Sequence, residues 1–460
     1  MKHVHFIGIG GTGLSAIARF LLENGYQVSG SDRILSPLAL ELINAGIQVF
    51  EGHHAQNIVG SDLVIRSSAV PDDNPEVIAA RAASIPVLKR SEFLGQLLED
   101  KTGIAIAGTH GKTTTTAMAA WVFTALGQEP SYIIGGVSKN LKNNAHAGKG
   151  KIFVIEADEY DYMFLGLRPS VIILTSVEHD HPDCFPTLED YNQAFKEFIG
   201  RLQKNGILMV CWDDPGAYGM IGAAPADCKI YSYGLSPEAD FRAHNLRLNP
   251  SGGFSFIISS RQTKEALAVV DLQVPGEHNV RNALGVFTAA HLLGFSADKT
   301  ALALNQFLGT GRRFDIQGEA CGVAVIDDYA HHPTEIAATL EAARNRFPGR
   351  RIWAVWQPHT YTRTRTLMAE YLTAFLSADC VLITEIYAAR EKQNAFSSKV
   401  IVDRITHPAA AYVPTLESAV AYLLENLKSG DVMLVLSAGD ADQISAAVLA
   451  GLREKEAANG

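Results

Sequence analysis

The strongest constraint on the fold is a glycine-bounded loop between an apolar run and a helical stretch near residue 110. Residues 104–107 predict a buried strand, the loop GTHGKTT follows at 108–114, and residues 115–122 predict a helix. A strand, a glycine turn and a helix start present backbone N–H groups and the positive end of a helix dipole to an anion. Lys112 adds a positive charge, and the Thr113 hydroxyl can reach Mg²⁺. The loop therefore predicts phosphate binding.

The loop departs from the usual phosphate-loop spacing, which would place a glycine at position 106. Ile106 stands there and the nearest glycine is Gly108, so the motif is a shortened variant. The alternative is an ordinary turn between a strand and a helix, in which Gly-Lys-Thr is incidental. We favour phosphate binding.

Length and composition indicate a globular protein of several domains. The chain has 460 residues, of which 47% are hydrophobic and 19% charged, and its formal net charge of -10 argues against a nucleic-acid partner. The five cysteines are scattered without a C-x-x-C pair, which suits reduced thiols. We find no leader and no apolar run of the roughly 18 residues that a membrane span needs. We therefore expect a cytoplasmic protein with no membrane partner.

A second glycine loop opens the chain. Residues 4–7 predict a strand, GIGGTG follows at 8–13, and residues 14–24 predict a helix, which is the context that a dinucleotide-binding G-x-G-x-x-G requires. Asp32 lies about 20 residues further on, where an acid commonly meets a ribose hydroxyl. A nicotinamide-dependent oxidoreductase is one interpretation. A strand–helix unit whose glycines only permit close packing is another.

Residues 1–98 continue with alternating strands and helices, which predicts a small doubly wound domain. Ser67, Ser68 and Ala69 follow the predicted strand 63–65, at the sheet edge where ligands of open α/β sheets bind. A dehydrogenase has no use for the second nucleotide-type loop. An enzyme that joins a nucleotide-carrying substrate to another molecule, driven by ATP, uses both loops.

Residues 99–311 place acidic residues at the ends of two predicted strands. Strand 152–155 ends in EADE at 156–159, and strand 171–175 leads into EHDH at 178–181. Carboxylates and imidazoles at strand ends beside a phosphate loop suit Mg²⁺ bound to ATP phosphates. For each segment alone, a solvated acidic loop is the alternative.

The later part of this region, residues 205–275, predicts an antiparallel side sheet without evident chemistry. Its expected strands cover residues 207–210, 230–233, 254–258 and 266–270.

Residues 312–460 predict a third α/β domain with two polar loops. DDYAHHPTE at 327–335 follows an apolar run and precedes a helix opened by Pro333. QPHTYTRTR at 357–365 follows the next apolar run, and its arginines suit carboxylates and phosphates. Asp, Tyr and two His residues at the end of a strand are more typical of a functional site than of a buried core.

Taken together, these motifs resemble those of the Mur ligase family, the ATP-dependent amide-forming enzymes of peptidoglycan synthesis. The resemblance is carried by 108–114, 156–159 and 178–181, then by GEHNVRNA at 276–283 and GTGRRFD at 309–315. It spans the whole chain in order, so it is more specific than either glycine loop.

The resemblance implies three α/β domains. The first, at 1–98, would be Rossmann-like and bind a UDP-sugar; the second, at 99–311, would be a phosphate-loop ATPase domain with the side sheet. The third, at 312–460, would be Rossmann-like, hold the amino acid and close the cleft. The motifs D-D-Y-x-H-H-P-T-E and Q-P-H-x-x-T-R-T most resemble the branch that adds L-alanine to the lactyl carboxylate of UDP-N-acetylmuramate through an acyl phosphate.

The implied reactants are UDP-N-acetylmuramate, L-alanine and ATP, with Mg²⁺ as cofactor, and the chain is expected to be a monomer or homodimer. A branch that recycles whole peptides shares the first motif of the third domain but typically lacks the second. Two alternatives from other classes are the oxidoreductase and a non-catalytic nucleotide-binding regulator.

The resemblance also implies roles for individual residues. The implied ATP-binding residues are Gly108, Thr109, His110, Gly111, Lys112, Thr113, Thr114, His278, Asn282, Arg313 and Asp328. The implied substrate-binding residues are Gly10, Gly11, Thr12, Gly13, Asp32, Ser67, Ser68, Ala69, Tyr329, His359 and Arg363. The implied magnesium ligands are Thr113, Glu156 and His181. The implied catalytic residues are Lys112, Glu156, His331 and His332, with either histidine as the base.

Two positions depart from the family pattern. Ser176 stands where the N-x-E-x-D-H motif frequently has asparagine. Phe195, beside Lys196, occupies the position at which several relatives carry a carbamoylated lysine, so that modification is not assigned.

Overall fold

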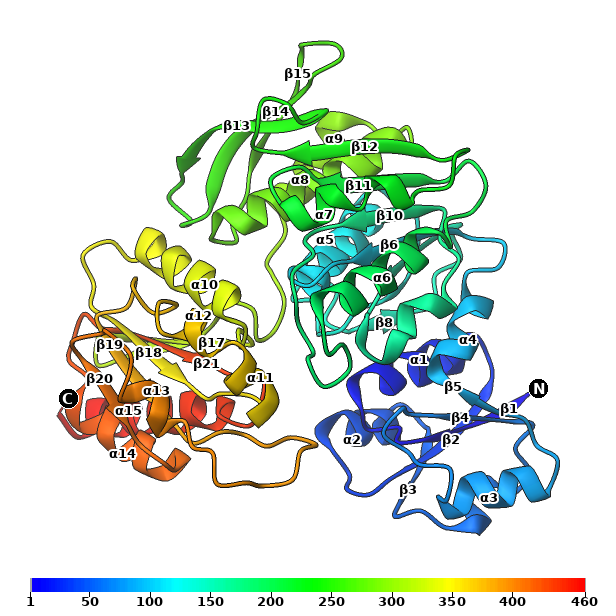
Figure 1. Ribbon diagram of the computed structural model, residues 1–460, viewed down its shortest axis with the longest axis horizontal. Helices are drawn as coiled ribbons and strands as arrows, with labels where there is room; N and C mark the ends of the chain where they lie inside the picture. Colours follow the sequence, from blue (N-terminus) through cyan, green and yellow to red (C-terminus); the bar gives the residue numbers. More distant parts are fainter. Residues whose placement is uncertain (1, 460) are drawn as a thin grey trace.

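The computed structural model describes residues 2–459, apart from the side chains of Thr12 and Asn459. These residues form three β-sheets that succeed one another along the chain, each with helices packed on it (Figure 1). The strands of the three sheets fall within residues 3–89, 102–271 and 315–436. The prediction of three successive α/β units is confirmed, and we keep the divisions at 98 and 311 as proposed domain boundaries.

The first sheet is parallel throughout, in the order β3-β2-β1-β4-β5. Its strands are β1 (His3–Ile7), β2 (Gln27–Asp32), β3 (Gln48–Glu51), β4 (Leu63–Arg66) and β5 (Val87–Lys89). Its helices are α1 (Thr12–Glu23), α2 (Pro37–Asn44), η1 (Ala55–Ile58), α3 (Pro75–Ala82) and α4 (Arg90–Leu97). The strand order reverses between β1 and β4, so the carboxyl ends of these two strands flank the crevice where such sheets bind ligands.

The second sheet is mixed, in the order β15-β14-β13-β12-β11-β10-β6-β9-β7-β8. Its strands are β6 (Thr102–Ala107), β7 (Ser131–Ile133), β8 (Ala145–His146), β9 (Ile152–Glu156), β10 (Val171–Leu174), β11 (Ile207–Cys211), β12 (Lys229–Gly234), β13 (Phe241–Leu248), β14 (Phe254–Ser260) and β15 (Ala266–Asp271). Its helices are α5 (Lys112–Ala125), η2 (Tyr160–Gly166), α6 (Leu188–Ile199), α7 (Pro215–Gly219), η3 (Ile221–Ala223), α8 (Glu277–Leu292) and α9 (Ala297–Asn305).

The side sheet differs in part from its prediction. The antiparallel arrangement is confirmed for β13, β14 and β15. It is wrong for β11 and β12, which pair in parallel and extend the main sheet beyond β10. The connection between β11 and β12 contains α7 and η3, and a crossover of this length permits parallel pairing. Strand β13 was not predicted, because its alternation of apolar and polar residues is interrupted between His244 and Arg247, where its register with β14 shifts.

The third sheet runs in the order β16-β17-β21-β18-β19-β20, with β16 antiparallel to the rest. Its strands are β16 (Asp315–Ala320), β17 (Val323–Asp328), β18 (Ile352–Trp356), β19 (Cys380–Ile383), β20 (Ala410–Tyr412) and β21 (Val432–Leu436). Its helices are α10 (Pro333–Arg346), α11 (Tyr361–Thr366), α12 (Met368–Tyr371), α13 (Lys399–Val402), α14 (Leu416–Asn426) and α15 (Asp442–Asn459).

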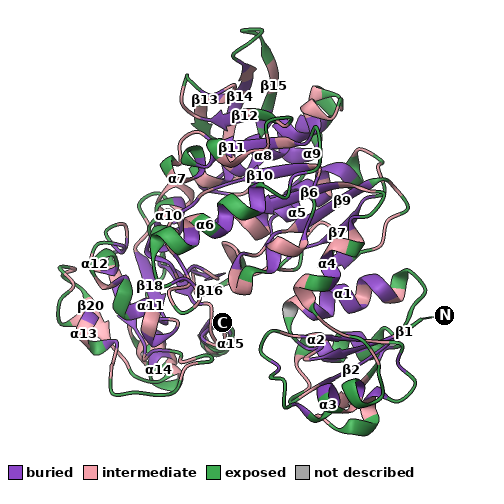
Figure 2. Ribbon diagram, turned by 45° about the vertical axis from the view of Figure 1, so that its right-hand side comes forward, coloured by how far each residue is buried: buried purple, intermediate pink, exposed green. Residues whose placement is uncertain are grey.

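The central strands are buried on both faces, as parallel sheets covered by helices require (Figure 2). The first unit packs on the second through α1, where the Phe20 ring centre lies 5.3 Å from that of Phe153 in β9. Within residues 2–459, no helix combines the length and the apolar character that a membrane crossing requires.

Candidate active site

Two glycines shape the loop that joins β6 to α5. Gly108 has a φ of +136°, and a Cβ placed there would lie 2.1 Å from the Thr175 hydroxyl oxygen. Gly111 has a φ of +78° and precedes the first turn of α5. No described side chain caps α5, and its first turn contains no acid. The N–H groups at its start are therefore open to an anion.

Lys112 folds back over this loop. Its Nζ donates to the carbonyl oxygens of Gly108 at 2.6 Å and Thr109 at 3.1 Å. It also pairs with the Glu159 carboxylate at 2.9 Å. Although burial opposes it, the charges of Glu159 and Asp158 raise the pKa of Lys112. The ammonium is thus a fixed positive charge beside the phosphate loop.

The predicted magnesium ligands form two adjacent groups. The Thr113 hydroxyl donates to Glu156 Oε1 at 2.9 Å, and the Gly135 N–H donates to Glu156 Oε2 at 2.6 Å. Burial raises the pKa of Glu156, so a nearby cation would favour its charged form. His181 belongs to the second group, in which its Nε2 lies 3.7 Å from Oε1 of Glu159. The oxygen donors of Thr113 and Glu156 fit Mg²⁺.

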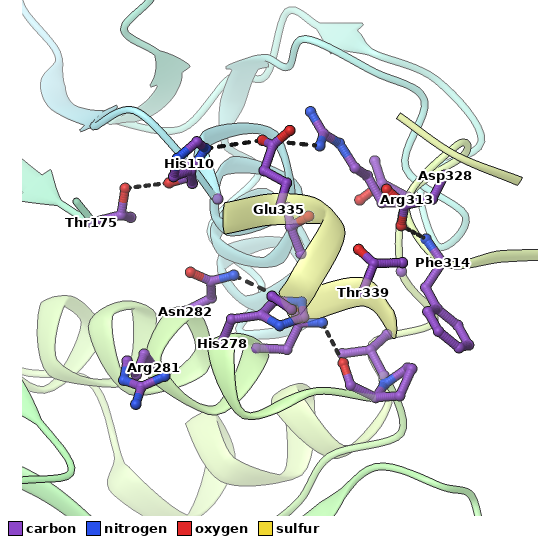
Figure 3. A pocket seen from close by; sticks show the side chains of 18 of the residues that line it. His110, Thr175, His278, Arg281, Asn282, Arg313, Phe314, Asp328, Glu335 and Thr339 are labelled. Carbon is purple, nitrogen blue, oxygen red and sulfur yellow. Dashed lines mark hydrogen bonds and ion pairs between the residues drawn. The ribbon is translucent and has the colours of Figure 1, made fainter. Parts of the chain in front are cut away.

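A cavity of about 600 Å³ lies beside the phosphate loop, between the second and third sheets (Figure 3). Its volume is typical of sites for small molecules. The predicted ATP-binding residues that line it are His110, Gly111, Thr114, His278, Asn282, Arg313 and Asp328. The remaining ones belong to the same loop and are Gly108, Thr109, Lys112 and Thr113.

Helix α8 supplies the polar groups on one wall of the cavity. Asn282 Nδ2 donates to Asn279 Oδ1 at 3.1 Å, and a Cβ on Gly111 would lie 2.8 Å from Asn282 Oδ1. Burial and the charge of Arg281 lower the pKa of His278 to about 4, so its ring is neutral. A carboxamide and a neutral imidazole offer the donors and acceptors that a heterocyclic base needs.

The third sheet contributes a carboxylate and a cation to the cavity. Asp328, at the end of β17, accepts hydrogen bonds from the N–H groups of Phe314 and Ala330, both at 2.7 Å. Burial raises the pKa of Asp328 to about 6 despite the charge of Arg313. The Arg313 guanidinium lies 5.0 Å from the ring centre of Tyr329. The cavity is therefore complete only when both sheets are present.

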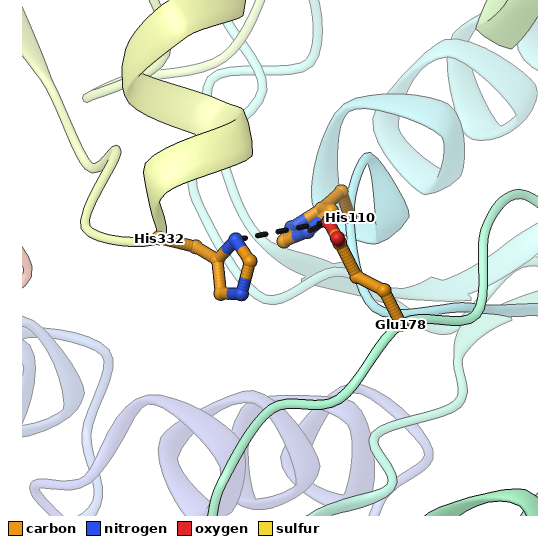
Figure 4. A group of neighbouring side chains, drawn as sticks. All are labelled: His110, Glu178 and His332. Atoms are coloured by element: carbon orange, nitrogen blue, oxygen red, sulfur yellow. Dashed lines mark hydrogen bonds and ion pairs between the residues drawn. The ribbon is translucent and has the colours of Figure 1, made fainter. Parts of the chain in front are cut away.

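His110 connects the phosphate loop to two carboxylates. Its Nε2 bonds to Glu178 (Figure 4), and its Nδ1 lies 3.1 Å from Glu335 Oε1. Although burial opposes it, these carboxylates raise the pKa of His110 to about 10. Ligand atoms of His110, Glu178 and His332 lie within 4.8 Å of one another, a spacing that could hold a metal. The proton-bearing nitrogens of His110 leave it no lone pair for a metal, so we assign no ion there.

Two adjacent histidines before α10 differ in the nitrogen that carries the proton. Nδ1 of His331 lies 2.9 Å from the Tyr329 carbonyl oxygen, which only accepts, so Nε2 holds the lone pair. Nδ1 of His332 accepts from the Thr334 N–H at 3.3 Å, so its proton is on Nε2. That Nε2 is buried without a partner among the described residues. Burial lowers the pKa of both rings, that of His331 to about 3, and keeps them neutral.

Arg363 links the loop after β18 to the second acidic motif. Its Nε donates to Asp180 Oδ1 at 2.8 Å, and its Nη1 donates to His359 Nδ1 at 3.0 Å. Its Nη2 lies 3.3 Å from His181 Nδ1, and the residue is 2% exposed. Arg363 and His359 thus lie where the third unit meets the second. Their contact with a sugar nucleotide stays a prediction.

The first glycine loop lies against the residues predicted to act with it. The Gly10 N–H donates to Asp32 Oδ2 at 2.8 Å, so the carboxylate also fixes the loop. A Cβ on Gly8 would lie 3.1 Å from the Ser67 Cβ, and the Ala69 N–H donates to Ser67 Oγ at 3.3 Å. The other predicted residues of these two loops are Gly11, Gly13 and Ser68. The side chain of Thr12 lies outside the described residues.

Three charged residues of the site were missed by the sequence analysis. Glu159 belongs to the EADE segment but was not chosen as the partner of Lys112. Glu335 stands three residues after His332 and completes a capping box, a spacing that could have been noticed. Arg90 belongs to no recognisable motif, and its position beside Gly13 of the first glycine loop is evident only from the fold.

These features define a class of protein: a phosphate-loop nucleotide enzyme whose site lies between α/β units. Family comparison matches residues 3–102 to the Mur ligase family, catalytic domain, residues 106–290 to the Mur ligase middle domain, and residues 312–439 to the Mur ligase, glutamate ligase domain. The chain belongs to the Mur ligase family.

Several relatives and solved structures are similar over their full length. A UDP-N-acetylmuramate–L-alanine ligase of Myxococcus xanthus is 40% identical over 454 residues, covering 98% of this chain and 95% of the relative. The crystal structure of UDP-N-acetylmuramate-alanine ligase from Thermotoga maritima has a TM-score of 0.84 at 29% identity, covering 99% of this chain and 100% of that one. A murein peptide ligase from Psychrobacter arcticus has a TM-score of 0.74 at 26% identity, covering 98% and 99%. These similarities favour a ligase over the oxidoreductase and the regulator.

Proposed function

We propose that this chain joins L-alanine to the lactyl carboxylate of UDP-N-acetylmuramate, with cleavage of ATP to ADP and phosphate. The observation that carries the proposal is the cavity beside the open N-terminus of α5, together with full-length similarity to ligases of that name. We assign the sugar nucleotide to residues 1–98, ATP to residues 99–311 and the amino acid to residues 312–460.

The first step must make the carboxylate reactive, because its oxygen is a poor leaving group. A carboxylate oxygen attacks the γ-phosphorus of ATP, the bond to the bridging oxygen breaks, and ADP leaves with that electron pair. Lys112 and the N–H groups at the start of α5 stabilise the charge on the transferring group. The product is an acyl phosphate.

Mg²⁺ would be held by Thr113 and Glu156, with His181 and Glu159 beside a second position. When bound, it supplies positive charge that neutralises the phosphate oxygens. The chain's own contribution is the oxygen-rich, buried pocket in which Glu156 is fixed by the Gly135 N–H.

The second step forms the amide. The amine of L-alanine attacks the acyl carbon, the C–O bond to phosphate breaks, and phosphate leaves. His331 Nε2 has the free lone pair, so we propose that it takes the proton that the nitrogen loses as it bonds to the acyl carbon, when that proton is most acidic. His332 Nε2–H has no partner among the described residues, and we propose that it donates to a developing oxyanion. In this proposal His331, rather than His332, is the base.

The contacts between the second and third units keep water from the acyl phosphate. Arg363 with Asp180, and His110 with Glu335, hold the two units together around the site. We also propose a cytoplasmic location, supported by five free cysteines that suit a reducing compartment.

Phosphate release tests the proposed function. We expect release only when ATP, Mg²⁺, UDP-N-acetylmuramate and L-alanine are all present. Replacing L-alanine with a tripeptide tests the peptide-recycling alternative. Release without the sugar nucleotide, or faster release with the tripeptide than with L-alanine, would reject the proposal.

A further inference from the structure

Arg90 is the first residue of α4. Its Nε has almost no solvent access and no hydrogen-bond partner among the described residues. Arg90 is half-buried, as is Lys112, which is paired with Glu159 at 2.9 Å, and the buried Arg363 lies 2.8 Å from Asp180. A partly desolvated cation without an anion is unfavourable unless something else neutralises it.

The guanidinium of Arg90 lies on the first turn of α1. A Cβ on Gly13 would lie 1.9 Å from Arg90 Nη1 and 2.3 Å from its Cζ, so only glycine permits this approach. Helix α1 follows the glycine loop, has no described side-chain cap, and has no acid in its first turn. The positive end of the helix dipole therefore meets a positive side chain, an arrangement that costs stability in the absence of an anion.

The same guanidinium faces the second unit. Figure 1 shows α4 beside α1, between the first and second sheets. The charges of Asp158 and Glu156, at the end of β9, act on Arg90, but burial outweighs them and its pKa is lowered. Glu156 is the proposed magnesium ligand, so the guanidinium at the glycine loop is also within electrostatic reach of the place where phosphoryl transfer would occur.

We propose that Arg90 binds anionic oxygens of the sugar nucleotide at the start of α1. This inference rests on the proposed function and adds a positioning residue that the motifs did not reveal. Two groups of UDP-N-acetylmuramate supply such oxygens, the diphosphate and the lactyl carboxylate. Both form charge-assisted hydrogen bonds with a guanidinium, and the bound anion also neutralises the helix end.

Calorimetric titration of Arg90→Met with UDP-N-acetylmuramate tests the proposal. Methionine keeps the apolar stem and removes the charge. We expect Kd to rise by about 10- to 100-fold, the effect of losing hydrogen bonds to a charged group, with partial recovery in Arg90→Lys. Arg81→Met is the matched control, because Arg81 lies in the same domain but is exposed and paired with Asp72 at 2.6 Å. Its Kd should equal that of the unchanged protein.

The source of the anion is identified by repeating the titrations with the neutral lactyl-amide derivative. If Arg90→Met weakens binding of UDP-N-acetylmuramate and of its lactyl amide equally, the anion is the diphosphate. If it weakens binding of the free acid alone, the anion is the lactyl carboxylate. A Kd within twofold of the unchanged protein for UDP-N-acetylmuramate would overturn the proposal.

Thermal unfolding without ligand separates binding from a structural role. Because Arg90 Nε has no hydrogen-bond partner among the described residues and its charge opposes the dipole of α1, we expect the Tm of Arg90→Met to be unchanged or higher. A lower Tm without ligand would assign Arg90 to the fold and overturn the proposal. The unchanged protein must itself bind UDP-N-acetylmuramate, so failure of that titration would reject the proposed function instead.

Discussion

His110 Nδ1 lies 3.1 Å from Glu335 Oε1, which joins the phosphate loop of the second unit directly to the first turn of α10 in the third. Beside this contact the Thr334 hydroxyl donates to Glu178 Oε2 at 3.2 Å. The residues that hold phosphate and those that we assign to the amine are thus connected through one imidazole. These contacts between the phosphate loop and α10 therefore depend on the position of the third unit against the second.

The contact predicts a dependence of stability on pH. The pKa of His110 is raised to about 10 in the folded protein, above its ordinary value of 6.5. The stabilisation is therefore complete below pH 6.5 and is lost as pH rises through 10. We expect His110→Gln to lower the free energy of unfolding by about 1–3 kcal/mol at pH 6 and by little above pH 10. Thermal unfolding across this range measures the difference.

The matched control for this prediction is His146→Gln. His146 also pairs with a carboxylate, Glu23 at 2.8 Å, but its side chain is 46% exposed. An exposed pair contributes little. The difference in the free energy of unfolding between the unchanged protein and His110→Gln should shrink as pH rises. A difference that stays constant up to pH 11 would contradict the assignment of a proton to His110.

Removal of the Glu156 charge should change the magnesium requirement. In Glu156→Gln, one ligand of the proposed ion loses its charge while its size is kept. We expect half-maximal phosphate release to need at least about 10-fold more Mg²⁺. Glu265→Gln, at an exposed position in the turn between β14 and β15, should leave the requirement unchanged. Equal magnesium curves for all three proteins would show that Glu156 is not a ligand.

We expect Lys112 to accelerate phosphoryl transfer without contributing to binding of the sugar nucleotide. In Lys112→Met we expect phosphate release to fall by about 10²–10³-fold, because a preorganised charge on the transferring group is lost. Titration with UDP-N-acetylmuramate should give an unchanged Kd, since none of the residues predicted to bind it lies in the second unit. A parallel loss of sugar-nucleotide binding would mean that the two sites are not separate.

The two histidines before α10 should respond differently to substitution. We expect His331→Gln to lower kcat by about 10²–10⁴-fold, as expected for a general base, with ATP affinity kept. His332→Gln should lower kcat less, because glutamine can still donate a hydrogen bond in place of Nε2–H. Steady-state kinetics with saturating substrates measures both. A larger loss in His332→Gln than in His331→Gln would reverse the proposed roles.

The sequence predicted much of the fold because its strongest patterns are local. Apolar runs ending in glycine loops predicted β1 and β6 with the helices that follow them, and the three α/β units came from the alternation of strands and helices. The parallel pairing of β11 and β12 could not be predicted, because strand direction depends on how a long connection crosses the sheet.

The residues of the candidate site that belong to sequence motifs were predicted. The contacts that form only when distant segments come together were not. Thr113 and Glu156 were chosen from separate segments, and the structure brings their side chains to 2.9 Å. The pairing of His110 with Glu335 spans 225 residues and depends on how the third unit closes. Arg90 belongs to no motif, and its significance comes from its position beside Gly13 and from an Nε without a partner in the described part of the chain.

The central claim is that the γ-phosphoryl group of ATP activates the lactyl carboxylate. UDP-N-acetylmuramate labelled with ¹⁸O at both oxygens of that carboxylate tests this directly, by mass spectrometry of the phosphate released with L-alanine. The account predicts one ¹⁸O atom in each phosphate, because the oxygen that attacks the phosphorus leaves with it. Phosphate without label, formed in step with the amide, would contradict the account.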